Sequence, residues 1–297
     1  DTVITVTLYD PTQEDLLNGC FDLAKKYENL FSATIDTSDI SRINAAKGKP
    51  VTVAPETIEL LKKGLYYGDL SGGRFDVTLR QLSALWNFSE NKGEIPKEED
   101  IQRAVDTIDY HNIEISENQV TLKNKKSAVD LGGIAKGYIA DKMKQYLNEN
   151  GVNAGIINLG GNVLTIGKKE QKPYKIGIQK PFSEAGTLLF SVDISDQTVV
   201  SSGTYERYFT ANDKIYHHIL DVSTGYPYDN GLIGVTVICE NSVDGDGLST
   251  TCFTLGLTDG MKLIESLEDT EAVFITNDYK LHMSSGMGKE IPYSIIE

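Results

Sequence analysis

The chain changes from strand to helix at residues 128–138, which read Ala-Val-Asp-Leu-Gly-Gly-Ile-Ala-Lys-Gly-Tyr. Apolar residues up to Leu131 indicate a strand, and Gly132-Gly133 indicate the turn that opens a helix over about 134–148. We expect this strand to be the second arm of a hairpin over 120–130, because a polar Lys-Asn-Lys-Lys turn precedes it. A hairpin that leads into a helix is typical of a fold that mixes antiparallel sheets with helices.

The rest of the chain continues this mixture of short strands and helices. Apolar residues at helical spacing predict helices at about residues 12–31, 55–70 and 98–105, and a further one after Asp246. Thr12 and Asp15 are spaced as a capping box for the first of these. Short apolar runs predict strands at residues 3–8, 155–159, 174–178, 188–194, 215–220, 232–239 and 272–276. We therefore predict an α+β (mixed α/β) fold of mainly antiparallel sheets with packed helices, in a single domain over residues 1–297.

Composition excludes several classes of protein. The 297 residues are 40% hydrophobic, which supplies a core and excludes a disordered chain. Lys and Arg number 28 against 43 Asp and Glu, and this net charge of −15 argues against a nucleic-acid partner. No apolar run reaches the roughly 18 residues that span a bilayer, so no transmembrane span is predicted. The three cysteines, Cys20, Cys239 and Cys252, are widely spaced, and we expect them to be buried.

The glycine turn at 130–138 is the first candidate for a ligand site. Glycines before a helix expose backbone N–H groups at the positive end of the helix dipole, where a phosphate binds well. Lys136 lies in the first helical turn, which is unfavourable for a positive side chain unless an anion pairs with it. The segment matches neither GxxxxGK[ST] nor GxGxxG, so a plain tight turn with an exposed Lys136 remains an alternative.

Acidic and hydroxyl residues follow one another at 244–250, which read Asp-Gly-Asp-Gly-Leu-Ser-Thr. Asp246 and Thr250 are four residues apart, so on a helix they face the same way and could both give oxygen to a hard cation such as Mg²⁺. The alternative is that Asp246 is the N-cap of the helix that follows.

Two adjacent histidines, His217 and His218, lie in a strand-like run. Side chains of neighbouring residues in a strand point to opposite faces, so the two rings cannot chelate one metal together. One of them could face a site and act as a general base, although a single strand histidine is more often structural.

Three further segments carry polar residues whose role the sequence leaves open. Residues 201–209 join hydroxyls with aromatic and charged side chains, which suits either a ligand or a hairpin with a Glu-Arg pair. The glycines of 158–162 indicate a close approach of the backbone to a ligand or to a neighbouring strand. Residues 38–44 indicate a loop or the start of a helix.

Together and in this order, these segments resemble the ApbE family, the FAD:protein FMN transferases. The matching segments lie within about residues 30–260. They are Ser38–Asn44, Gly73–Asp76, Asp130–Tyr138 with Asp141, Asn158–Asn162, Val200–Phe209, Tyr216–Pro227, and Asp246–Thr250 with Phe253 and Gly256. The Asp-Leu-Gly-Gly-Ile-Ala-Lys-Gly and Ser-Ser-Gly-x-Tyr-Glu-Arg strings are the most specific of them.

The resemblance implies transfer of FMN from FAD to a Thr or Ser hydroxyl of an acceptor protein through a phosphoester bond, with release of AMP. It implies Mg²⁺, or else Mn²⁺, as the metal, and FAD as the substrate. It also implies work outside the cytoplasm, as a cell-membrane lipoprotein whose signal segment is absent from this chain. Two alternatives stay open: an FAD pyrophosphatase that gives FMN and AMP, and an FAD-binding protein without turnover.

The resemblance also implies residue roles. The implied metal ligands are the backbone carbonyl of Gly133 and the side chains of Asp246, Ser249 and Thr250. The implied flavin-nucleotide contacts are Arg74, Phe75, Asp76, Asp130, Lys136 and Leu220. His218 is the expected catalytic base, and His217 is expected to matter less. Thr34 stands where the family often has an aromatic residue, so we expect the flavin ring to be stacked differently there.

Overall fold

The computed structural model describes residues 3–10, 14–90 and 93–296. Its contacts divide the chain into two compact units. Unit 1 comprises residues 1–25, 136–203 and 231–297, and unit 2 comprises residues 26–135 and 204–230. Because the chain passes between the units at four places, no single linker separates them. The prediction of one family domain over residues 1–297 stays a prediction.

Unit 1 is built on a seven-stranded sheet with the order β1-β5-β6-β9-β12-β13-β14. All neighbouring strands in this sheet are antiparallel. The strands are β1 Ile4–Leu8, β5 Ala154–Leu159, β6 Asn162–Gly167, β9 Thr198–Gly203, β12 Leu232–Cys239, β13 Glu271–Thr276 and β14 Leu281–Met283. All eight residues of β12 are buried, which explains why this strand reads as a continuous apolar run instead of an alternating one.

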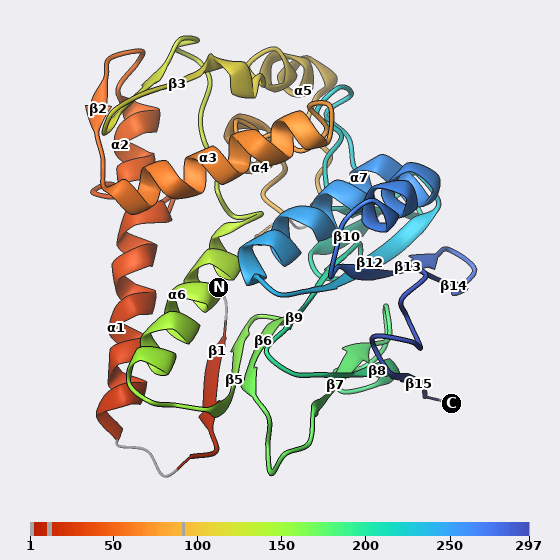
Figure 1. The fold of residues 1–297 in the computed structure, drawn as a ribbon. Coiled ribbons are helices and arrows are strands. Elements are labelled where there is room, and N and C mark those ends of the chain that lie inside the picture. Colours follow the sequence, from red (N-terminus) through yellow and green to blue (C-terminus); the bar gives the residue numbers. More distant parts are fainter. Residues whose placement is uncertain (1–2, 11–13, 91–92, 297) are drawn as a thin grey trace. The chain divides into compact units, whose positions relative to one another are not determined.

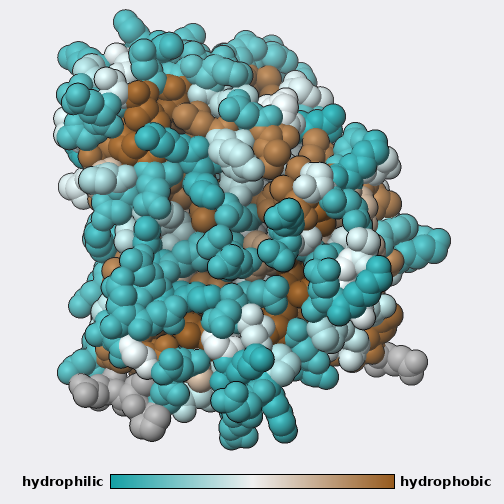
Figure 2. Space-filling model, viewed as in Figure 1, coloured by the Kyte–Doolittle hydropathy of each residue, from teal (hydrophilic) through white to brown (hydrophobic). Residues whose placement is uncertain are grey.

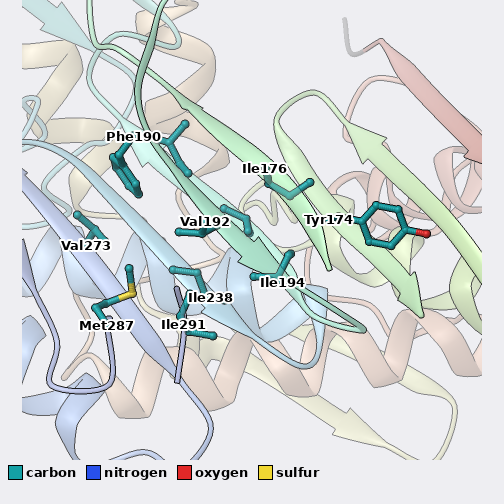
Figure 3. Close-up of a cluster of buried hydrophobic side chains, with 11 residues drawn as sticks. Tyr174, Ile176, Phe190, Val192, Ile194, Ile238, Val273, Met287 and Ile291 are labelled. Atoms are coloured by element: carbon teal, nitrogen blue, oxygen red, sulfur yellow. The ribbon is translucent and has the colours of Figure 1, made fainter. Parts of the chain in front are cut away.

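A second sheet of unit 1 has the order β15-β8-β7. Its strands are β7 Tyr174–Gln179, β8 Leu188–Ile194 and β15 Tyr293–Ile295. Figure 3 shows Phe190, Val192 and Ile194 of β8 in one cluster with Ile238 of β12 and Val273 of β13. The two sheets of unit 1 therefore share an apolar core.

Helices of unit 1 contact its large sheet (Figure 1). They are α6 Ala135–Glu149, which begins one residue before the unit boundary, α7 Ser242–Glu265, and the first part of α1 Glu14–Phe31. Cys20 of α1 and Met143 of α6 are buried in a cluster with Ile157 of β5. A Cβ added to Gly137 of α6 would lie 2.1 Å from the carbonyl oxygen of Ser242, so the two helices touch there through their backbones.

Unit 2 combines short helices with two small antiparallel sheets. Its helices are α2 Asp39–Ala45, α3 Pro55–Leu70, α4 Arg80–Trp86, α5 Glu98–Val105 and the 3-10 turn η1 Tyr110–Asn112. Its strands are β2 Val51–Thr52, β3 Ile113–Ser116, β4 Gln119–Leu122, β10 Tyr208–Ala211 and β11 Lys214–His217. Trp86 is fully buried at the centre of an aromatic core, with Phe88 and Tyr216 stacked at 5.5 and 5.6 Å between ring centroids.

The α+β prediction is confirmed, and the helices at 55–70 and 98–105 have the predicted bounds. The hairpin predicted over 120–130 is wrong: β4 pairs with β3 before it, and residues 128–131 form no strand with β4. The Val129 N–H donates instead to the side chain of Asn44 (2.6 Å). The strand predicted at 215–220 ends at His217. Thr12, half of the predicted capping box, lies outside the described residues.

The three cysteines are buried, as the sequence predicted. Burial raises the pKa of the Cys20 thiol to about 11 and that of Cys252 to about 12. Figure 2 shows one face of the molecule, which is mostly hydrophilic with several apolar patches. None of the helices in the described residues combines the length and the apolar character that a membrane crossing requires.

Candidate active site

Helix α7 begins at Ser242, and its first turn is held by an acidic residue of α6. The N-cap residue Asn241 makes no side-chain capping bond. The Asp141 carboxylate instead accepts hydrogen bonds from the N–H groups of Ser242 and Val243, both at 2.8 Å. Burial raises the pKa of Asp141 to about 6, although these two bonds act in the opposite direction. Asp246 therefore lies beyond the first turn, and the alternative that it caps the helix is wrong.

The Asp246 carboxylate is buried and fixed at both oxygens. Oδ2 accepts the N–H of Gly137 at the start of α6 (2.5 Å), and Oδ1 accepts the amide of Asn162 (3.1 Å). Burial raises the pKa of Asp246, while the nearby charge of Lys136 lowers it. Lys136 lies in the first turn of α6, as predicted. Its positive charge is balanced in part by the Asp246 carboxylate.

Ser202 of β9 contacts two hydroxyls of α7, one helical turn after Asp246. Ser202 Oγ is 2.9 Å from Ser249 Oγ and 3.1 Å from Thr250 Oγ1. Ser249 Oγ also donates to the backbone carbonyl of Asp246 (3.1 Å). The structure thus brings four of the predicted residues together within unit 1: Lys136, Asp246, Ser249 and Thr250.

Asn162 and Ser202 were missing from the predicted site, although their segments were singled out as polar turns. The Ser242 hydroxyl donates to Asn162 Oδ1 (2.5 Å), which leaves the Asn162 amide N–H groups to face Asp246. This bond fixes the orientation of the Asn162 side chain. The signal in the sequence was the Asn-Leu-Gly-Gly-Asn string itself, but nothing in it specifies a partner 84 residues away.

On α7, the carboxylate nearest in sequence to these hydroxyls is that of Asp246. Among residues 3–10, 14–90 and 93–296, no three His, Cys, Asp or Glu side chains lie close enough together to hold a metal. A cation at α7 would therefore be held by one carboxylate together with hydroxyl or carbonyl oxygens. Such an all-oxygen set suits Mg²⁺ or Mn²⁺ better than Zn²⁺ or a copper ion.

In unit 2, Asp76 organises the segment that carries Phe75. Asp76 Oδ1 accepts the N–H and the hydroxyl of Thr78 (2.7 and 2.6 Å), and Oδ2 accepts the N–H of Tyr110 (2.9 Å). Burial raises the pKa of Asp76. The carboxylate is thus used inside the fold, where it fixes the backbone next to Phe75.

The Phe75 ring lies against the glycine turn of unit 2. A Cβ added to Gly133 would be 3.3 Å from Phe75 Cε2, so a larger residue would require the ring to shift by a few tenths of an ångström. Gly133 itself is exposed, which leaves its peptide group accessible. Phe75 and Gly133 are therefore predicted site residues that the structure places in contact.

Asp130 and Arg74 are held differently. Asp130 Oδ1 accepts the N–H of Gly132 (3.0 Å), and Oδ2 lies 3.6 Å from the Arg80 guanidinium. Arg74 is exposed, and its charge partly offsets the burial that raises the pKa of Tyr228 to about 12. Arg74 therefore lies near the Tyr228 phenol, at the end of the loop that follows His218.

His218 and Leu220 lie at the start of that loop, just after β11. The His218 N–H donates to the Arg207 carbonyl (3.1 Å), and the imidazole is half-buried. Leu220 is buried in the aromatic core around Trp86. The Trp86 indole N–H donates to the carbonyl of Gly225 (2.8 Å), which ties the loop to α4.

Known proteins that this chain resembles identify its family. The model of the ApbE family matches residues 1–274. A FAD:protein FMN transferase of Klebsiella pneumoniae is 38% identical over 275 residues, which cover 92% of this chain and 85% of that protein. One from Treponema pallidum is 30% identical over 288 residues, covering 91% and 80%. The crystal structure of the ApbE protein from Thermotoga maritima superimposes with a TM-score of 0.86 at 30% identity, covering 96% of this chain and 93% of that one. The chain belongs to the ApbE family.

Proposed function

We propose that this chain transfers FMN from FAD to a Thr or Ser hydroxyl of an acceptor protein, with Mg²⁺ bound and AMP as the leaving group. The chain is a flavin transferase, like the relatives that match it over most of their length. One observation carries the metal-dependent form of the reaction: the buried carboxylate of Asp246 belongs to α7, one helical turn before the hydroxyl residues Ser249 and Thr250, and the positive charge of Lys136 is nearby.

The donor atoms fit a hard divalent cation. Asp246 and Thr250 of unit 1 would bind it through side-chain oxygens, with Ser249 beside them. The Gly133 carbonyl stays an expectation of the family resemblance. A bound Mg²⁺ would offset negative charge on the pyrophosphate of FAD and on the departing AMP. Because burial raises the pKa of Asp246, a cation near this carboxylate would favour its ionised form.

Lys136 and His218 have separate tasks in this proposal. Lys136 would place a positive charge near the phosphoryl oxygens, where it stabilises charge that develops in the transition state. His218 would accept the proton of the acceptor hydroxyl. The hydroxyl oxygen forms a bond to the FMN phosphorus as the bond between that phosphorus and the AMP oxygen breaks.

The unit 2 residues near the glycine turn would bind the flavin nucleotide. Phe75 would stack its ring on the nucleotide, and Arg74 would provide a positive charge. Asp76 would act through the backbone that it fixes, and Leu220 through its packing in the aromatic core. Asp130 would orient the glycine turn through its bond to the Gly132 N–H.

The family resemblance also supports a location outside the cytoplasm. We propose that the natural protein is a lipoprotein at the cell membrane. Cell fractionation with a fatty-acid label would test this, and an unlabelled protein in the cytoplasmic fraction would contradict it.

The reaction is tested by incubating the protein with FAD, Mg²⁺ and an acceptor domain that carries a flavinylation Thr. AMP release and the intact mass of the acceptor are followed together, with and without EDTA. AMP release with an FMN-sized mass gain supports the transferase. AMP and free FMN without that gain would favour the pyrophosphatase, and intact FAD would contradict both. The same acceptor with Thr replaced by Val controls for the site of attachment.

A further inference from the structure

The two adjacent histidines have different surroundings in unit 2. His217 is the last residue of β11 and is 5% exposed. Its ring nitrogen Nε2 lies 2.9 Å from the carbonyl oxygen of Tyr228. The N–H of Ile219 donates to the other ring nitrogen, Nδ1, at 3.3 Å. Both nitrogens of His217 are therefore used inside the fold.

These partners fix the tautomer of His217. A carbonyl oxygen can only accept, so Nε2 carries the hydrogen, and a backbone N–H can only donate, so Nδ1 carries the lone pair. A second proton on Nδ1 would break the bond to Ile219. Burial lowers the pKa of His217, against the Tyr228 carbonyl and the charge of Asp229, which raise it. The ring is thus suited to hold the backbone and not to take up protons.

The bonds of His217 surround residue 218. The N–H of His218 donates to the Arg207 carbonyl at 3.1 Å, and the next N–H along the chain, that of Ile219, donates to His217. The Ile219 carbonyl in turn accepts the N–H of Tyr228 at 3.1 Å. The peptide groups on both sides of the His218 Cα are therefore anchored, and the side-chain torsions are the main freedom left to its imidazole.

We propose that His217 is a positioning residue that fixes the backbone of His218, and with it the place of the catalytic base. This inference rests on the proposed function, because it gives His218 the proton transfer. It differs from the expectation that His217 matters less than His218. An anchored base keeps its reach to the acceptor hydroxyl from one turnover to the next, and a shift of about 1 Å can lower a rate on the order of a hundred-fold.

The test replaces His217 in two ways. His217→Phe keeps a ring of similar size but leaves the Ile219 N–H and the Tyr228 carbonyl without their partner. We expect kcat to fall about ten- to a hundred-fold, with the KM for FAD changed less than about two-fold, because both ring nitrogens of His217 are bound inside the fold. His217→Asn places an amide oxygen near the position of Nδ1, so it should restore part of kcat. His282→Phe, a histidine of β14 in unit 1, is the matched control and should keep the activity of the parent.

A spectroscopic measurement adds a readout that does not depend on turnover. With ¹⁵N-labelled histidine, NMR should show the His217 ring as the neutral Nε2–H form, without titration between about pH 6 and 8. A His217 ring that takes up a proton in this range would overturn the proposal.

Parallel assays separate this inference from the proposed function. If His218→Ala is inactive while His217→Phe has the kcat of the parent, the positioning role is wrong and the base role stands. An active His218→Ala protein would instead refute the base role. Should His217→Phe fail to fold, His217→Asn is compared with His217→Gln, which can reach only the Tyr228 carbonyl. The Asn variant should be the faster of the two, and equal kcat values would contradict the proposal.

Discussion

Two regions hold their polar groups in different ways. One is the α7 cluster of unit 1, made of Asn162, Ser202, Asp246, Ser249 and Thr250. The other is the loop after β11 in unit 2, residues 218–228. In the α7 cluster, several bonds join side chains: Asn162 donates to Asp246, and Ser202 contacts Thr250. The backbone N–H of Gly137 also donates to Asp246. In the loop, backbone groups and the aromatic core hold His218 in place. We therefore expect substitutions in the α7 cluster to affect activity most. In the loop, we expect substitutions that disturb the backbone or the packing to affect the free energy of unfolding most.

Removal of Asp246 should have the largest effect. We expect Asp246→Ala to lower Mg²⁺-dependent AMP release by on the order of a hundred- to a thousand-fold, because one buried carboxylate anchors the oxygen set. The free energy of unfolding should fall by about 1–3 kcal/mol, because the Gly137 N–H and the Asn162 amide lose their acceptor. Asp244→Ala, two residues earlier on α7, is the control and should stay within about ten-fold of the parent. A thermal melt that collapses together with activity would point to a structural role instead.

A side chain at Gly225 should disrupt the loop more than any polar change there. Gly225 has φ +76°, and a Cβ would lie 2.4 Å from Ile101 Cγ2 and 2.8 Å from Val105 Cγ2. Gly225→Ala should therefore lower the free energy of unfolding by about 3 kcal/mol, from backbone strain and overpacking together. Gly72→Ala separates the two causes, because Gly72 has φ +63° with open space around it. It should lose only about 1 kcal/mol in the same urea titration followed by circular dichroism.

The bond between Trp86 and Gly225 should contribute somewhat less. Trp86→Phe removes the indole N–H and leaves the Gly225 carbonyl unpaired next to a small cavity, so unfolding should become easier by about 2 kcal/mol. Tyr226→Phe is the comparison, since its hydroxyl bonds the Glu98 carboxylate at an exposed position (2.5 Å). A change within about 0.5 kcal/mol is expected there. Equal losses in the two variants would mean that the Trp86 bond has no special weight.

Near neutral pH, the smallest expected effect is a dependence on pH from Asp141, because its pKa lies below this range. Its pKa is raised from 3.8 to about 6 by burial, so the folded protein binds this proton more tightly than the unfolded chain. The contribution to stability is therefore greatest below about pH 4, falls as the pH rises through about 6, and is constant above, with a total of about 3 kcal/mol. Melting temperatures of the parent and of Asp141→Asn are compared between pH 4 and 8. The parent should lose stability relative to the variant as the pH rises through about 6, and the difference should then stay constant. A difference that stays constant over the whole range would contradict the raised pKa.

The sequence predicted those helices and strands whose ends are determined by neighbouring residues. Helix α3 begins at Pro55 and ends at the Ser71-Gly72-Gly73 turn, and both signals are in the sequence. Strand β12 is recognised by its apolar run. The start of α7 could not be predicted, because Asp141, which holds it, lies 101 residues earlier. The failed hairpin has the same cause, since Asn44 binds Val129 across 85 residues.

The candidate site was predicted in part for the same reason. Asp246, Ser249 and Thr250 stand close together in the sequence, so one helix brings them together. Ser202 and Asn162 reach them from neighbouring strands, and only the strand order places them there. The proposed role of His217 depends on the carbonyl of Tyr228, 11 residues further along the chain. The conformation of the loop between them could not be predicted from the sequence.

The positions of two rare residue types allow the two units to be followed separately in an unlabelled sample. The single tryptophan, Trp86, is in unit 2, whereas all three cysteines are in unit 1 and buried. Indole fluorescence therefore reports the unfolding of unit 2, and reaction with a thiol reagent reports the opening of unit 1. Coincident midpoints in urea would show one cooperative transition, and separate midpoints would give each unit a stability of its own.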